Sequence, residues 1–515
     1  MTVSQRRSIR GEQQPGFLEV LTNWLPHQPW CPGLTGRRSL ARVGGLRLPA
    51  PEGDADSQLF LELHVFEVED AAQSHDQPVL ISVPLALRSR PSTLAGKAAF
   101  IGKLSSEDGN ELWVYDGARD RAFLAAIIEM ARRRQGSRNG RSRGEALAGF
   151  EHWDPLTVDM RRHPAEPALD YSTRTLVQPA GTEDEADWEK KVAVDILRRP
   201  SVQRDLRFET VFRLTAAHST AVSRVLGTVT GAWQEHVPGQ QWQDLDWDTG
   251  ELVVIRESAA AAPEALSLAR TSLRTGKSFA STAQELGHTL GDFHADLAGA
   301  FGAHPQATPQ LKAMAARAQN ALQAQWKAVR HEFDEDEAAD LHEVIDLMTM
   351  QLRDSDEPLL LQRIHGDVTA AALHRLAQSR WVVSEAGGFA EHELGMQDVI
   401  TVLMSLANMV MEEASEASVH AEGAEPSNGE SSAGGGSTEA DGTEDVQTQD
   451  PVNYGQWYEE VSMRFLQGYR SSDADTSGID SVFFRAAMLT ASLELFSRWE
   501  GSWVFRPSML LQVQN

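Results

Sequence analysis

Short apolar runs, each interrupted by Gly, Pro or Asp, follow one another along the first half of the chain. Between residues 40 and 104 these runs are LARVGGLRL, LFLELHVFEV, VLISVPLAL and AAFIGKL, and they are β-branched or alternate apolar with polar positions. This spacing predicts an antiparallel sheet. Residues 111–134 predict a strand, a turn at Asp116-Gly117 and a helix, and residues 169–256 predict further strands around a helix at 203–218. The first half is therefore expected to be rich in sheet.

From residue 280 onward the apolar positions recur every three or four residues, which is the spacing of an amphipathic helix. The predicted helices carry the apolar sets Leu286, Leu290, Phe293, Leu297 and Phe301; Leu322, Trp326 and Val329; Leu341, Val344, Ile345, Met348 and Leu352; Tyr458, Val461, Phe465 and Tyr469; and Phe484, Met488, Ala491 and Leu495. The second half is expected to be helical.

Two stretches lack this regular pattern. Residues 132–144 hold six arginines among Gly, Ser and Asn. They are interpreted as a solvated, disordered loop rather than a basic patch for an anionic partner, because no aromatic residue is interleaved. Residues 414–450 contain no Lys, Arg or aromatic residue and are predicted to be a disordered acidic insertion.

Composition narrows the possible partners and compartment. The chain of 515 residues carries a formal charge of −27, which disfavours nucleic acid and anionic membranes as main partners. Its length suggests two to four domains at roughly 150 residues each. The lone Cys31 excludes an internal disulfide framework. With no apolar stretch long enough to span a membrane and a polar start unlike a signal peptide, the chain is expected to be cytoplasmic.

Candidate chemistry centres on His365-Gly366-Asp367. An apolar run at 359–364 breaks at Gly366, and a second run at 381–383 ends close to Glu385. This pattern predicts a strand, a catalytic loop and a second strand, with the carboxylates of Asp367 and Glu385 in one cleft. Asp367 is interpreted as either a general base or a turn residue, with equal weight.

The neighbouring polar residues have structural interpretations. His365 is expected to brace the loop by hydrogen bonds rather than to react. Asp398 is expected to be a structural carboxylate that holds the same loop. His218, His288 and His294 are too scattered for a metal cluster, and His294 is predicted to lie on an apolar helix face, either in the core or at its edge.

A sheet-rich part followed by a helical part with an Asp-bearing loop is the organisation of a kinase-type phosphotransferase. In this order, the segments WLPHQPW, VYDGARDRAFLAAIIEMA, ELGHTLGDFHADLAGAFG, QRIHGDVTAAAL and WVVSEAGG resemble those of bacterial maltokinases. Those enzymes are aminoglycoside-kinase-like and phosphorylate maltose with ATP in the trehalose-to-glycogen route.

The resemblance implies an α+β, bilobal protein-kinase-like fold, similar to that of aminoglycoside phosphotransferases, with an N-terminal α+β cap domain. It implies the following division: a disordered tail at 1–20, a cap at 21–131, an Arg/Gly-rich linker at 132–165, a sheet-rich N-lobe at 166–262 and a helical C-lobe at 263–515 that contains the acidic insertion.

The resemblance also implies site residues. Asp367 and His365 fall on the catalytic loop, and Glu385 corresponds to a metal-binding Asp of the family. Ala372 stands where the family has a metal-binding Gln, and a methyl group cannot coordinate Mg²⁺. Asp195 stands where the family has the lysine that contacts the ATP phosphates.

Two further segments correspond to the family's kinase lobe. Glu209 matches the helix carboxylate that pairs with that lysine, and Arg256-Glu257-Ser258 resembles the hinge.

Two functions follow from this resemblance. The first is a pseudokinase that binds a sugar or an enzyme of trehalose, maltose and α-glucan metabolism as a regulatory partner. The second is an active sugar kinase that uses Asp367, ATP, Mg²⁺ and a repositioned cation to convert maltose to maltose 1-phosphate or to phosphorylate an amino sugar.

Overall fold

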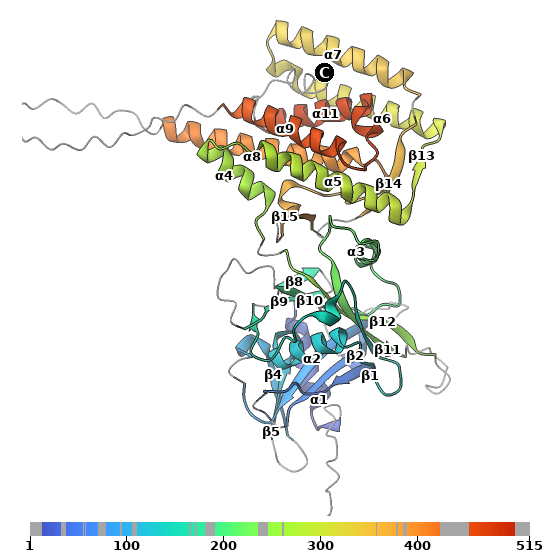
Figure 1. Ribbon diagram of the computed structural model, residues 1–515, viewed down its shortest axis with the longest axis vertical. Coiled ribbons are helices and arrows are strands. Elements are labelled where there is room, and N and C mark those ends of the chain that lie inside the picture. The colour runs from blue at the N-terminus through green and yellow to red at the C-terminus, as the bar shows by residue number, and fades with distance from the viewer. Residues whose placement is uncertain are drawn as a thin grey trace, which may run out of the picture. The chain divides into compact units, whose positions relative to one another are not determined.

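The computed structural model of the protein describes residues 13–31, 38–54, 56, 58–70, 79–92, 95–105, 111–163, 166–169, 172–180, 191–234, 246–259, 262–356, 358–376, 380–384, 389–422 and 453–499. The chain divides into two compact units (Figure 1). One comprises residues 1–218 and 223–261, and the other comprises residues 219–222 and 262–515. The first twelve residues of the expected N-terminal tail lie outside the described residues.

The first unit is built on a 12-stranded sheet in which the named strands pair antiparallel. The strand order is β4-β5-β3-β2-β1-β11-β12-β10-β9-β7, with β6 added to β11 and β8 to β9. The bounds are β1 Arg38–Leu48, β2 Phe60–Asp70, β3 Val79–Arg88, β4 Phe100–Ser105, β5 Glu111–Asp116, β6 Arg143–Ala146, β7 Arg161–Arg162, β8 Glu166–Leu169, β9 Ser172–Gln178, β10 Val192–Leu197, β11 Val225–Trp233 and β12 Asp248–Glu257. The predicted antiparallel sheet is confirmed.

Strands of the expected cap and of the expected N-lobe belong to this one sheet. The junction is the pairing of β1 with β11, where Gly44 lies opposite Trp233. A Cβ atom at Gly44 would overlap the carbonyl oxygen of Ala232, so glycine permits the close approach of the two strands. The cap strands therefore extend the sheet of the lobe that follows them.

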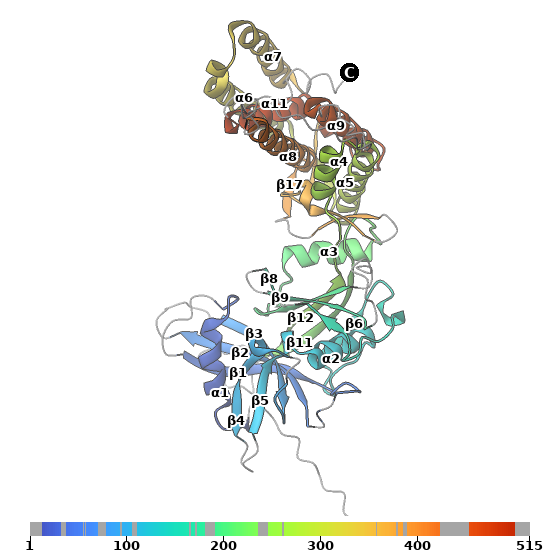
Figure 2. The ribbon, with the colours of Figure 1, turned by 90° about the vertical axis from the view of Figure 1, so that its left-hand side faces the viewer.

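Three helices accompany the sheet (Figure 2): α1 Phe17–Trp24, α2 Arg121–Arg132 and α3 Leu206–Ala216. Asp120 caps α2 because its carboxylate accepts hydrogen bonds from the backbone N–H groups of Ala122 and Phe123. The apolar side chains Phe123, Ile127 and Met130 of α2 are buried. The helix contacts β6 and β11 and buries its apolar face in the main core of the unit.

The interpretation of residues 132–144 as a disordered loop is wrong. Ser137 and Ser142 close a turn through a backbone hydrogen bond of 2.8 Å, and the chain then enters β6, which pairs with β11. Arg141 lies over the indole ring of Trp247, 3.8 Å from its centroid. The aromatic partner comes from a distant part of the sequence, which is why local composition did not reveal this ordered hairpin.

The second unit is mainly helical. Its helices are α4 Ala265–Thr275, α5 Ala280–Phe301, α6 Thr308–Val329, α7 Glu335–Asp354, α8 Met396–Glu422, α9 Tyr454–Arg470, α10 Ser477–Asp480 and α11 Val482–Arg498. Its strands are β13 Ala303–Pro305, β14 Leu360–Ile364 and β17 Ala390–Glu393 in one sheet, with β15 Leu373–Arg375 and β16 Trp381–Val383 in another. The helices predicted from apolar spacing are confirmed.

The α5 and α9 helices of this unit pack closely. A Cβ atom at Gly287 would overlap the carbonyl oxygen of Phe465, and one at Gly468 would overlap that of Gln284.

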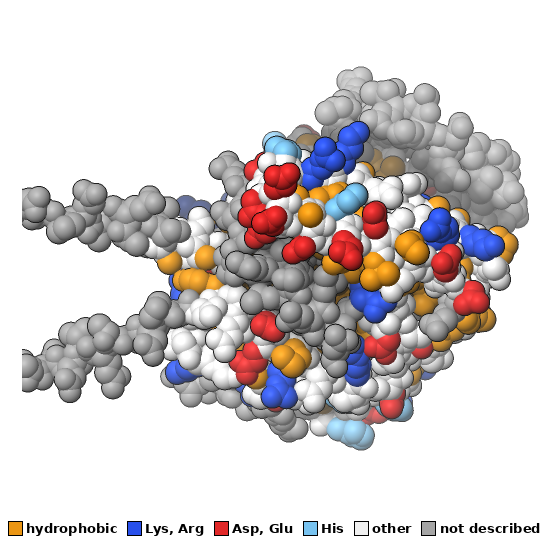
Figure 3. All heavy atoms as spheres, turned by 90° about the horizontal axis from the view of Figure 1, so that it is seen from above, with side chains coloured by type: hydrophobic (Ala, Val, Ile, Leu, Met, Phe, Trp, Pro, Cys, Tyr) orange, Lys and Arg blue, Asp and Glu red, His pale blue; other side chains and the backbone are white. Residues whose placement is uncertain are grey.

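Among the described residues no helix has the length and apolarity needed to cross a lipid bilayer. Seen from above Figure 1, the surface carries acidic, basic and hydrophobic side chains side by side (Figure 3).

The expected disordered insertion does not start at residue 414, because α8 continues to Glu422. Ala and Glu, which favour helix, recur in this stretch. Arg270 and Arg274 of α4 form ion pairs with Glu412, Glu413 and Glu416 of α8 and so fix its exposed side. Residues 423–450 lie outside the described part of the chain.

A buried ion pair joins β5 to the end of β10. Arg198 is fully buried, and its Nη2 donates to both carboxylate oxygens of Asp116 at 3.0 Å. Its Nε donates to the hydroxyl of Thr173, and its guanidinium lies over the ring of Trp30. Burial lowers the pKa of Arg198, and the Asp116 carboxylate opposes this shift.

We expect Asp116→Ala to lower the free energy of unfolding by about 3–5 kcal/mol, because it leaves the buried Arg198 cation without its carboxylate. Urea denaturation of the full chain measures this change. The matched control is Glu111→Ala, which removes an exposed pair with Lys103 and should cost less than about 1 kcal/mol. Equal losses in the two variants would contradict the assignment of Arg198 as a buried clamp.

Candidate functional site

The His365-Gly366-Asp367 loop leaves the end of β14 and leads into a short 3₁₀ helix at Ala370–Ala372. Gly366 has a φ of 85°, in the left-handed region where a residue with a Cβ atom is strained. The glycine therefore allows the sharp turn that places Asp367 on the surface. The predicted sequence of strand, loop and strand is confirmed by β14 and β16.

Asp398, in the first turn of α8, holds this loop from behind. Its buried carboxylate accepts hydrogen bonds from the backbone N–H of His365 at 2.8 Å and of Gly366 at 2.9 Å. His294 Nε2 lies 3.0 Å from the same carboxylate, and the Tyr469 hydroxyl lies 2.8 Å from His294 Nδ1. The prediction that Asp398 holds the loop is confirmed, and His294 lies in the core rather than at its edge.

His365 braces the loop from inside, as predicted. Its Nε2 donates to the carbonyl oxygen of Ser384 at 2.9 Å, while Nδ1 faces the backbone N–H of Asp367 at 3.4 Å. This arrangement requires a neutral ring with the proton on Nε2. Burial lowers the pKa of His365, and the nearby Asp398 only partly opposes this shift. A neutral histidine that shapes the loop is the result.

Asp367, like Gly366 before it, is exposed. Within the described ranges its carboxylate has no hydrogen-bond or ion-pair partner, whereas its backbone N–H faces His365. A carboxylate that is exposed and held on a braced loop can accept a proton from a hydroxyl group. The geometry therefore suits a general base, and it equally suits a turn residue.

The two positions where the resemblance implies metal ligands are Ala372 and Glu385. Ala372 is nearly buried and presents only a methyl group, and its backbone serves the fold by accepting a hydrogen bond from the Ser384 N–H. Glu385, the other expected ligand, lies outside the described residues. In the described part of the chain no three His, Cys, Asp or Glu side chains gather closely enough to hold a metal ion.

Asp195 lies on β10 in the first unit and is completely buried. Arg174 of β9, directly opposite in the register, donates from Nε and Nη2 to the two carboxylate oxygens at 2.7 and 3.0 Å. Arg256 of β12 donates from Nε to the same carboxylate at 2.7 Å. Burial raises the pKa of Asp195, and Arg174 acts against that rise. The carboxylate, at the position where the resemblance implies a lysine, is thus neutralised by two guanidinium groups.

Neither arginine was expected as a partner from the sequence. Arg174 is one polar position in an alternating strand, and Arg256 lies in the segment that resembles the hinge. Both arginines lie on strands that pair with β10, and their side chains point to the same face of the sheet as that of Asp195. Only the strand order β12-β10-β9 reveals this.

Glu209 of α3, expected to be the helix carboxylate of a kinase lobe, has two cationic partners. Arg204 lies 3.0 Å from it, and Arg213, one helical turn further on, lies 2.7 Å from it. These contacts lower the pKa of Glu209 against the effect of burial. The carboxylate therefore has a role without the family's lysine, because it ties α3 to the loop that precedes it.

The fold is similar to that of solved glucosamine kinase structures. A glucosamine kinase in one crystal form matches with a TM-score of 0.50 and 15% identity, over 96% of this chain and 96% of that chain. A glucosamine kinase in complex with glucosamine, ADP and inorganic phosphate matches with a TM-score of 0.48 and 15% identity, over 97% and 98% of the two chains. At such identity the first match establishes the fold alone.

A family model matches the N-terminal part of the chain. Residues 24–120 match the family described as the maltokinase N-terminal cap domain. No curated protein matches the sequence of the chain. The resemblance to maltokinases, the α+β kinase-like fold and the N-terminal cap are thereby confirmed.

We expect Asp398→Ala to destabilise the protein by several kcal/mol, because it leaves two loop N–H groups and His294 without their buried acceptor. Asp367→Asn, at an exposed position, should change stability by about 0.5 kcal/mol or less. Urea denaturation compares the two variants, and amide hydrogen exchange at residues 365–366 reports the loop itself. Similar stabilities would show that Asp398 does not hold the loop.

We expect His365 to titrate below the ordinary histidine value of about 6.5, because burial disfavours its cation. A pKa depressed on folding stabilises the protein above the unfolded value, and this contribution is lost as the pH falls below it. Imidazole NMR spectra recorded against pH, assigned with His365→Gln, measure the midpoint. A midpoint above 6.5 would overturn the neutral bracing role.

Proposed function

We propose that the protein is a maltokinase-like pseudokinase that acts as a binding or regulatory subunit in trehalose, maltose and α-glucan metabolism. The observation that carries this proposal is Asp195, a buried carboxylate held by Arg174 and Arg256 at the position of the family's phosphate-binding lysine. Ala372, at the position of a metal ligand, supports the same conclusion.

Phosphoryl transfer depends on positive charge at the phosphates of ATP, because there is little covalent chemistry for the protein to perform. Arg174 and Arg256 place three of their N–H groups on Asp195. A phosphate approaching this strand face would meet a carboxylate and would compete with it for both cations. The arrangement favours a stable fold without bound nucleotide.

Two features of the scaffold, the shared sheet and the braced loop, support a binding role. The cap lies in one sheet with the following lobe, and the His365-Gly366-Asp367 loop is fully braced. Such a scaffold can present a shaped surface to a sugar or to an enzyme that handles trehalose or maltose. We propose those two classes of partner, and the acidic charge of the chain disfavours nucleic acid and anionic membranes.

One observation favours a second candidate, an active ATP-dependent sugar kinase. Asp367 is exposed on a braced loop, which is the arrangement a general base requires. In this case ATP and Mg²⁺ would be the cofactors, and Arg174 or Arg256 would act as the repositioned cation. Maltose, giving maltose 1-phosphate, and an amino sugar are the candidate substrates.

Isothermal titration of the full chain with Mg-ATP, and separately with maltose, tests the proposal. We expect no nucleotide binding and no phosphate transfer to maltose or glucosamine. Asp367→Asn is the matched variant, because it alters the candidate base while leaving the braced loop in place. Nucleotide binding in the micromolar range, together with phosphate transfer that Asp367→Asn abolishes, would establish the active kinase instead.

A further inference from the structure

Three partly exposed arginines belong to segments that meet beside the start of α2 in the first unit. Arg119 ends a short 3₁₀ helix at Gly117–Arg119, Arg121 is the first residue of α2, and Arg162 lies on β7. Acidic residues outnumber basic ones by 74 to 47 in this chain. Arginines that find no carboxylate in such an acidic chain are therefore informative.

The sheet brings Arg162 to the face that α2 covers. Arg162 pairs with Val177 of β9, and residues directly opposite each other in antiparallel strands have their side chains on one face. Val177 belongs to the same core as the buried side chains of α2. The neighbouring Thr175 of β9 donates from Oγ1 to the carbonyl oxygen of Ala118, just before Arg119, at 2.7 Å. The strands and the start of α2 are thus joined at this place.

The two carboxylates nearest these arginines in the sequence already have partners. Arg88 donates from Nε and Nη2 to the two carboxylate oxygens of Asp120, each at 3.0 Å. Arg198 donates to both oxygens of Asp116 at 3.0 Å. Arg119 Nε lies 3.9 Å from Asp116 Oδ2, which is beyond hydrogen-bond distance. The carboxylates therefore neutralise the buried Arg88 and Arg198 rather than the partly exposed arginines.

The donors of Arg121 and Arg162 lack acceptors. Within the described ranges the Arg121 side chain has no hydrogen-bond or ion-pair partner, and its Nε is buried. Arg162 Nε is also buried and unpartnered, and Nη2 donates only to the carbonyl oxygen of Ala95 at 3.5 Å. Burial and the like charges of Arg121 and Arg119 lower the pKa of Arg162. A group of cations that repel one another and retain unused donors is suited to an anion.

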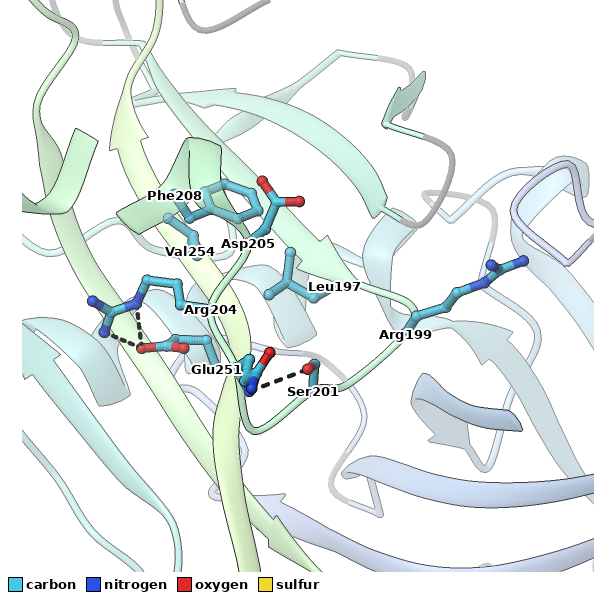
Figure 4. Close-up of a pocket in the computed structure, with 9 residues that line it drawn as sticks. Leu197, Arg199, Ser201, Arg204, Asp205, Phe208, Glu251 and Val254 are labelled. Carbon is cyan, nitrogen blue, oxygen red and sulfur yellow. Dashed lines mark hydrogen bonds and ion pairs between the residues drawn. The ribbon is translucent and has the colours of Figure 1, made fainter. Parts of the chain in front are cut away.

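The pocket between β10 and α3, of about 350 Å³, shows the contrasting arrangement (Figure 4). Arg204 lines it and pairs with both Glu251 and Glu209. Arg199 also lines it, but its side chain points away from the other lining side chains in Figure 4. The charge of Arg204 is thus already balanced by two carboxylates.

We propose that Arg119, Arg121 and Arg162 bind a phosphate group, either inorganic phosphate or the phosphate of a small phosphomonoester. A guanidinium group presents its N–H donors as a planar fork that matches phosphate oxygens. The bound anion would offset the repulsion among the three cations and would join the start of α2 to β7. The site includes neither Asp195 nor Asp367, so it is separate from the function proposed above.

Titration calorimetry of the full chain with inorganic phosphate, in phosphate-free buffer at constant ionic strength, tests the proposal. We expect phosphate to bind and to raise the unfolding temperature, because a ligand of the folded state stabilises it. Arg162→Gln should lower the affinity roughly tenfold or more, since it removes a charged donor. Arg121→Gln should do the same. Glycerol phosphate is the second probe: tighter binding than that of inorganic phosphate identifies an organic phosphate as the ligand, and weaker binding identifies free phosphate.

Arg133→Gln is the matched control, because it removes the same charge beside the other end of α2. Arg133 pairs with Glu129, and its side chain is 59% exposed. This variant should bind phosphate like the unaltered chain. Arg121→Gln keeps the test valid if Arg162→Gln fails to fold. Absence of phosphate binding, equal stabilisation by chloride at the same ionic strength, unchanged affinity in Arg121→Gln, or an equal loss in Arg133→Gln would each overturn the proposal.

Discussion

A carboxylate removed from water must be paired or protonated, and this constraint governs the first unit. Asp195 is completely buried in the middle of β10, and its charge is acceptable there only because β9 and β12 each contribute an arginine to the same face. The three strands are therefore matched by charge as well as by register. A lysine at this position would need a different set of neighbours, so the exchange of one residue is compatible with the fold only through the exchange of several.

The second unit contains a buried network of side chains that supports a loop. Asp398, His294 and Tyr469 form a buried chain of hydrogen bonds that ends on the backbone of the His365-Gly366-Asp367 loop. Burial raises the pKa of Tyr469, which keeps its hydroxyl protonated as a donor. The loop shape is thus specified by buried residues that lie behind it. A buried network of this kind stabilises the fold whether or not the exposed carboxylate of Asp367 takes part in catalysis. The shape of the loop is therefore no evidence of activity by itself.

Apolar periodicity was sufficient to predict the antiparallel sheet, the long helices and the strand–loop–strand around Asp367, since these depend on local spacing. The expectations that Asp398 and His365 are structural agree with the hydrogen bonds that both residues make. The ion pairs across the sheet could not be predicted, because nothing near Asp195 in the sequence indicates Arg174 or Arg256 as its partners. Local composition also failed at residues 132–144 and 414–422, where partners distant in sequence contribute to the order: Trp247 contacts Arg141, and Arg274 pairs with Glu416.

The junction of β1 with β11 has a consequence for how the chain folds as it is made. Gly44 is synthesised long before Trp233, its partner across the sheet. Until β11 emerges, that edge of β1 has no strand to receive its hydrogen bonds, and an unpaired edge invites pairing with other nascent chains. The pairing of β1 at this edge is therefore complete only after β11, in the following lobe, has been synthesised.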